Sequence, residues 1–168
     1  HVYTDSREGD LYCLTADKGR EVWKKNTRKD FGAQPGNWAL AGSPVIFDGK
    51  LILDAGVVIA LNPKTGAKVW TSDKVKAGYS TPSMFERGGR KYLACFNAHG
   101  LWIVDIRNGR KIADHRWETN YDVNAVTPIV SGRNVFISSG YGVGCTLVNM
   151  GDGGLREVYR NKDMCNHY

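Results

Sequence analysis

The sequence predicts an all-β fold made of about four four-stranded antiparallel sheets. The first reason is composition, because 20 glycines against 5 prolines in 168 residues indicate many tight turns. The second is periodicity, because no window carries a sustained helical apolar stripe and the longest purely apolar run, at 57–61, has the length of a strand. The third is an internal repeat that recurs every forty-odd residues.

The repeat is clearest in Ala60-Leu-Asn-Pro-Lys-Thr-Gly66-Ala-Lys-Val-Trp70. Residues 13–23 have the same shape, residues 103–113 end in alanine instead of tryptophan, and residues 147–159 form a more worn copy. The positions that define the motif are Gly19, Trp23, Asn62, Gly66, Trp70, Asp105 and Gly109.

Each residue type in the motif has a local physical task. Asn62, or Asp105 in the next copy, can accept a hydrogen bond from the backbone two residues further on and so set up a turn. The glycine that follows adopts the positive φ that other residues resist. We expect the tryptophan to lie on the outermost strand, where its ring covers the junction between neighbouring sheets.

A Ser/Thr-Pro pair begins each complete unit, at residues 43–44, 81–82 and 127–128. In the best unit the expected strands are 44–47, 50–53, 57–61 and 67–72. One such sheet per repeat is typical of a β-propeller blade. A β-sandwich of similar strand count is the alternative, but it would not need the same turn four times. We expect repeats at 1–36, 37–78, 79–119 and 120–163, a further blade beginning at 164–168, and only three strands in the first repeat.

Residues 60–70 resemble the tryptophan-docking motif of the pyrroloquinoline quinone (PQQ)-type propeller family at every specified position. The resemblance covers essentially the whole chain. Quinoprotein dehydrogenases, the outer-membrane-assembly lipoprotein propeller and many secreted bacterial propellers share this repeat. The resemblance implies a ring of seven or eight blades, of which this chain forms about half, and a periplasmic or extracellular location. The remainder of the ring, or other chains, would then cover the open blade faces.

The loops before the Ser/Thr-Pro pairs gather round the channel of a propeller and combine aromatic with polar residues. Such residues can stack on a planar ligand and bond to its edges, although packing of the blade ends is the alternative. The candidate contact residues for a ligand or partner are Asn37, Trp38, Tyr79, Tyr121, Asn124 and His167.

Two classes of function follow from the resemblance. Its enzymes hold PQQ against a tryptophan with an arginine and with Ca²⁺ bound by Glu and Asn, use an Asp as base, and often carry an adjacent cysteine pair. This chain lacks that pair, and Asp122 is the carboxylate closest to the candidate asparagines. We therefore expect no catalytic residue, metal or cofactor, and a scaffold that binds a protein or cell-envelope component through its rim loops. The alternative is a fragment of a PQQ- and Ca²⁺-dependent dehydrogenase that oxidises alcohols or sugars.

Charge, cysteine spacing and apolar run length argue against a nucleic-acid site, a zinc site and a membrane span. The net charge of +6 comes from basic residues scattered along the chain, which indicates a solvated surface more than a nucleic-acid site. Cys13 and Cys95 are expected to be buried thiols because they lie in apolar strand-like runs. The spacing of the four cysteines does not suit a zinc site. No apolar run is long enough to span a membrane.

Overall fold

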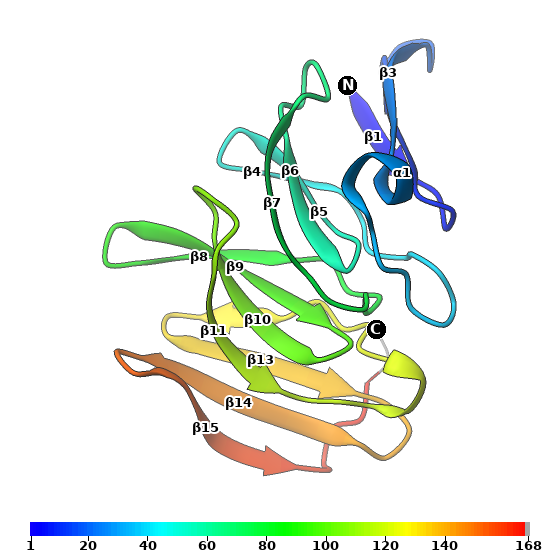
Figure 1. Cartoon of the computed structure of the whole chain (residues 1–168). Helices are drawn as coiled ribbons and strands as arrows, with labels where there is room; N and C mark the ends of the chain where they lie inside the picture. The colour runs from blue at the N-terminus through cyan, green and yellow to red at the C-terminus, as the bar shows by residue number, and fades with distance from the viewer. Residues whose placement is uncertain (167–168) are drawn as a thin grey trace.

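The computed structural model describes residues 1–166 and shows an arc of four antiparallel sheets that fan out side by side (Figure 1). Within every sheet the strands are neighbours in the order of the chain. This is the arrangement of consecutive propeller blades, so the predicted fold class is confirmed.

The first sheet has three strands, as the sequence predicts, and the other three have four. The first sheet contains β1 (Val2–Asp5), β2 (Asp10–Leu14) and β3 (Glu21–Asn26). The second contains β4 (Val45–Phe47), β5 (Lys50–Asp54), β6 (Val57–Leu61) and β7 (Lys68–Lys74). The third contains β8 (Ser83–Arg87), β9 (Arg90–Asn97), β10 (Gly100–Asp105) and β11 (Lys111–Arg116). The fourth contains β12 (Ile129–Ser131), β13 (Asn134–Ser139), β14 (Gly144–Gly151) and β15 (Gly154–Asn161).

Two short helical segments interrupt the strands. The helix α1 (Thr27–Phe31) begins where the side chain of Asn26 accepts a hydrogen bond from the backbone of Lys29, and it ends at Gly32 with a φ of 72°. The second segment is the 3-10 turn η1 (Asn120–Asp122). In the part of the chain that the structure describes, no helix is long and apolar enough to cross a membrane.

The core lies between the sheets, and β6 shows how. All its residues are buried because both faces of the second sheet are covered. Ile59 and Leu61 pack toward the first sheet with Leu11, whereas Val58 and Ala60 pack toward the third. Alternate residues of one strand thus join two cores, as the two-residue period of a strand requires.

The first three copies of the repeat share their local geometry, with φ values of 64°, 69° and 77° at Gly19, Gly66 and Gly109, whereas the strands of the fourth copy continue into a tight turn between Gly151 and Gly154. Asn62 Oδ1 accepts from the backbone of Lys64 at 2.9 Å, and Asp105 Oδ1 accepts from that of Arg107 at 2.9 Å, which is the predicted turn. In every copy the register between the last two strands shifts one residue after the position opposite the tryptophan. The residues at the tryptophan position are Trp23, Trp70, Ala113 and Tyr159.

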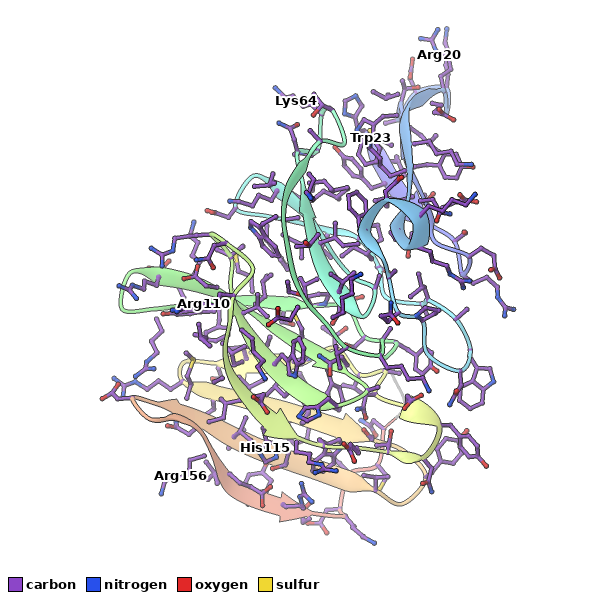
Figure 2. All side chains as sticks on the ribbon, in the orientation of Figure 1. Arg20, Trp23, Lys64, Arg110, His115 and Arg156 are labelled. Atoms are coloured by element: carbon purple, nitrogen blue, oxygen red, sulfur yellow. The ribbon has the colours of Figure 1, made fainter. Side chains whose placement is uncertain are left out.

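Each tryptophan of the motif docks on the turn of the next sheet. The Trp23 indole donates to the Pro63 carbonyl at 3.0 Å, and a methyl group on Gly66 would lie 2.9 Å from the Trp23 ring. Trp70 donates to the Ile106 carbonyl at 2.9 Å. Figure 2 labels Trp23 beside the turn that carries Lys64. The two indoles therefore occupy equivalent surroundings at successive junctions.

Substitution of Gly109 tests this docking. A Cβ at Gly109 would lie 2.5 Å from the Trp70 ring, and the φ of 77° already disfavours any other residue. Gly19 has a similar φ of 64° but nothing within 4 Å of a Cβ. We expect Gly109→Ala to lower the free energy of unfolding by at least about 1 kcal/mol more than Gly19→Ala, because only the first clashes. Urea denaturation of both variants measures the difference, and equal losses would mean that the ring does not press on the turn.

The four cysteines are free thiols. Cys13, Cys95 and Cys145 are buried, and Cys165 is partly exposed. Burial raises the pKa of the Cys95 thiol well above its usual value, so this group stays neutral. The predicted structural role of Cys13 and Cys95 is consistent with these positions.

Candidate functional site

The loops that connect consecutive sheets lie on one side of the arc, and the docking turns lie on the other (Figure 1). Five of the candidate residues stand in these connecting loops, and three of them carry large aromatic rings: Trp38 before β4, Tyr79 before β8 and Tyr121 before β12. The β13–β14 turn adds Tyr141 on the same side. We call these four residues the aromatic mouth.

The Trp38 ring contacts two other rings of the aromatic mouth. The centroids of Trp38 and Tyr79 are 6.1 Å apart at an interplanar angle of 63°, and those of Trp38 and Tyr121 are 5.7 Å apart at 66°. These edge-to-face arrangements are the favourable geometry for aromatic pairs. Tyr141, Trp38, Tyr79 and Val123 line a shallow cavity of about 260 Å³. Sequence positions about forty residues apart therefore meet at one surface.

Tyr79 holds the loops of the mouth together. Its hydroxyl accepts a hydrogen bond from the Trp38 backbone at 3.1 Å and donates to the Tyr121 carbonyl at 3.5 Å. Its own backbone N–H donates to the Asn124 carbonyl at 2.9 Å. The neighbouring Gly78 allows this approach, since a Cβ there would lie 2.8 Å from the same carbonyl oxygen.

A polar bridge links the same loops. The Lys76 ammonium lies 2.6 Å from the Asp122 carboxylate and donates to the Asn37 side chain at 3.1 Å. Asn37 is exposed, and it contributes to the mouth through this bond. The Lys76 ammonium thus joins the loops before β4 and β12. This link restricts the motion of the two loops and of the rings that they carry.

Unusual backbone conformations occur at two of the rings. Tyr121 has a φ of 62° and Tyr141 a φ of 55°, values that bulky residues rarely adopt. Such conformations persist where the surroundings enforce them, and they concentrate at binding and catalytic sites. Sequence reasoning missed Tyr141. The signal that could have found it is its place between Gly140 and Gly142, which is typical of a tight turn.

Asn124 lies behind the mouth instead of on it. It is fully buried, and its amide donates to the carbonyls of Asn97 at 2.8 Å and Trp117 at 3.0 Å. Its side-chain oxygen accepts from Ser139 at 2.9 Å. These bonds engage both the nitrogen and the oxygen of the side chain inside the fold. The sixth candidate, His167, lies outside the described residues.

The donor set at the mouth differs from the set that the quinoprotein resemblance implies. Asp122 is the carboxylate beside the rings, and Lys76 engages it. Within residues 1–166, no three His, Cys, Asp or Glu side chains come together as metal ligands. The mouth therefore offers exposed rings and hydroxyl groups instead of a ready site for Ca²⁺.

Comparison with known proteins gives several related matches. The family model described as outer membrane protein assembly factor BamB matches residues 1–163. A quinohemoprotein alcohol dehydrogenase of Comamonas testosteroni is 32% identical over an alignment of 110 residues that covers 60% of this chain and 15% of the dehydrogenase. The structure of BamB from Moraxella catarrhalis matches 95% of this chain with a TM-score of 0.64 and 17% identity.

A second solved structure is similar in fold. Quinohemoprotein alcohol dehydrogenase ADHIIG from Pseudomonas putida HK5 matches 95% of this chain with a TM-score of 0.63 and 14% identity. The chain spans 49% of the BamB structure and 32% of this one, so it corresponds to a part of each. Identities this low show the fold alone. The family match extends over nearly the whole chain and agrees with the docked indoles of the repeat, so the chain belongs to the PQQ-type β-propeller family that outer membrane protein assembly factor BamB represents.

Proposed function

We propose that this chain is a non-enzymatic propeller segment of an exported bacterial protein, in the periplasm or at the cell surface. It binds a protein or cell-envelope partner through the aromatic mouth. The observation that carries the proposal is the exposure of three rings on one surface: 56% for Trp38, 66% for Tyr121 and 76% for Tyr141. The other four tryptophans are at most 9% exposed.

The physical support is the combination of exposed aromatic area with a fixed geometry. Large apolar side chains gathered on a surface are typical of interaction sites. Tryptophan and tyrosine are also the residues most enriched among those that dominate binding energy. The hydrogen bonds of Tyr79 and the Lys76 bridge order the loops before binding, which reduces the entropy lost on association.

The Trp38→Ala variant tests the proposal. We expect it to weaken binding of an envelope partner by about thirtyfold or more, the effect of losing a dominant interface residue. The variant should melt close to the wild-type temperature, because the ring is exposed. Partners recovered from a periplasmic extract on wild-type protein are titrated against both proteins by surface plasmon resonance.

The matched control is Tyr12→Ala on β2, a partly exposed ring in another part of the arc. It removes an aromatic ring without touching the mouth, so binding should stay within about twofold of wild type. Equal losses in Trp38→Ala and Tyr12→Ala would place the partner elsewhere. A partner that binds Trp38→Ala as well as wild type would overturn the proposal.

The second candidate function is a fragment of a PQQ- and Ca²⁺-dependent dehydrogenase of alcohols or sugars. The identity of 32% to a quinohemoprotein alcohol dehydrogenase favours it, as does the exposed Trp38 ring as a stacking platform. The chain is mixed with PQQ and Ca²⁺, passed through gel filtration and examined for retained quinone absorbance. Quinone that is retained and reduces a dye in the presence of an alcohol or sugar would favour the dehydrogenase over the scaffold. Loss of the quinone on the column would support the scaffold.

A further inference from the structure

The junction between the third and fourth sheets is built differently from the two before it. Ala113 stands where Trp23 and Trp70 dock, and a methyl group on Gly153 would meet nothing within 4 Å. A cleft of about 260 Å³ lies here, lined by Ala113 together with Gly151 and Gly154 of the facing turn. The place that an indole fills at the earlier junctions is therefore open at this one.

Arginine side chains line the cleft. Arg87 of β8 donates to the Gly151 carbonyl at 3.1 Å and pairs with Asp152, so it takes over the indole's contact with the docking turn. Arg90 of β9 and Arg110 of the β10–β11 turn also line it. Figure 2 labels Arg110 at that turn, on the side of the arc opposite the connecting loops.

The cations of the cleft outnumber its anions. Asp105 is the buried carboxylate of the cleft, and Arg107 occupies it through Nε at 3.0 Å and Nη2 at 2.6 Å. Asp152 is taken by Arg87. In the described part of the chain, no carboxylate lies within ion-pair distance of Arg90 or Arg110. Arg90 and Arg110 therefore line the cleft without a direct ion pair, and the charge of Arg90 lowers the pKa of the Asp105 carboxyl only from beyond that distance.

We propose that this cleft, which we call the Arg110 cleft, binds one oxyanionic group, a carboxylate or a phosphate, between Arg90 and Arg110. The guanidinium fork matches the geometry of both groups and binds them with two parallel hydrogen bonds. The volume is below the about 300–1,000 Å³ of pockets that enclose whole ligands, so it suits a single anionic group of a larger molecule. The site lies on the opposite side of the arc from the aromatic mouth and is independent of the function proposed there.

Titration of the 168-residue chain with inorganic phosphate, and separately with acetate, tests the site at constant ionic strength. The arginine Nε–Hε signals are followed by NMR. Arg20 and Arg156 lie toward opposite ends of the arc and serve as internal controls (Figure 2). We expect saturable shifts at Arg90 and Arg110 that are absent at the two controls. Saturation by phosphate alone or by acetate alone identifies the group that the site takes. Unsaturated drift that is equal at all four arginines would overturn the proposal.

Two variants distinguish anion binding in the cleft from non-specific attraction of anions to a basic protein. Ala113→Trp rebuilds the docking of the earlier junctions and fills the cleft, so the shifts at Arg90 and Arg110 should disappear while those signals remain. Arg110→Gln keeps the backbone and removes one charge, and the apparent affinity should fall by about tenfold or more. Arg156→Gln is its control. If Ala113→Trp does not fold, the test rests on Arg110→Gln. An anion affinity of Arg110→Gln equal to that of Arg156→Gln would exclude the site.

Discussion

Replacing Trp70 with alanine is expected to lower the free energy of unfolding by about 3–5 kcal/mol, the range measured for large aromatic side chains removed from a core. The Trp70 ring is 8% exposed and lies between the second and third sheets among Ile52, Leu93 and Val104. Its indole also donates to the Ile106 carbonyl at 2.9 Å, and this buried acceptor would lose its partner. Urea denaturation followed by far-UV circular dichroism measures the loss.

The control for this substitution is Trp38→Ala, which removes the same side chain from the aromatic mouth. The Trp38 ring is 56% exposed and contacts Tyr79 and Tyr121 at the surface, so its removal should lower the free energy of unfolding by only about 1 kcal/mol. A loss in Trp70→Ala as small as in Trp38→Ala would show that the indole does not hold the junction. Since both variants lose one tryptophan, the difference reports location alone.

The fold could be predicted from the sequence because its signals are local. A turn residue, a glycine and a tryptophan within eleven positions specify one docking unit, and the unit recurs. The strand expected at 57–61 is β6, Val57–Leu61, and the strand expected at 50–53 is β5, Lys50–Asp54. The positions of the strands follow from the residue pattern within each repeat, so each copy of the repeat predicts one sheet without reference to the rest of the chain.

The site could be predicted only in part because it depends on contacts between residues that are far apart in the sequence. Trp38, Tyr79 and Tyr121 were found through their common place before each sheet. Whether a loop residue faces solvent or the interior is not a local property, and so Asn124 could not be told apart from Tyr121. The Lys76–Asp122 bridge joins positions 46 residues apart, and no spacing rule indicates it. The helix α1 was also missed, since five residues are too few for a helical period.

Replacing Asp54 with asparagine is expected to stabilise the protein at neutral and alkaline pH. The Asp54 side chain is buried, and desolvation raises the pKa of its carboxyl from 3.8 to about 6. The folded state then binds this proton more tightly than the unfolded state. Its stability therefore falls as the pH rises from about 4 to about 6, and the full cost is present above that range. A shift of about two pKa units corresponds to about 3 kcal/mol.

The third sheet shows that an asparagine fits this position. Asp54 Oδ1 accepts from the Gly56 backbone at 3.0 Å, and Asn97 Oδ1, at the same end of the second strand of its sheet, accepts from the His99 backbone at 3.0 Å. Among residues 1–166 the Asn97 amide nitrogen has no hydrogen-bond partner, so the same unpaired amide in Asp54→Asn would cancel part of the gain in stability. We expect Asp54→Asn to raise the free energy of unfolding by about 2 kcal/mol at pH 8 and to change little at pH 3.

The measurement is urea denaturation of wild type and Asp54→Asn from pH 3 to pH 8. The two curves should meet near pH 3 and separate between pH 4 and pH 6. A further dependence over the same range should remain in the variant, because burial also raises the pKa of Asp5 to about 6. The Asp5→Asn, Asp54→Asn double variant should remove it. Curves that stay parallel from pH 3 to pH 8 would show that Asp54 titrates alike in the folded and unfolded states, and that its burial carries no electrostatic cost.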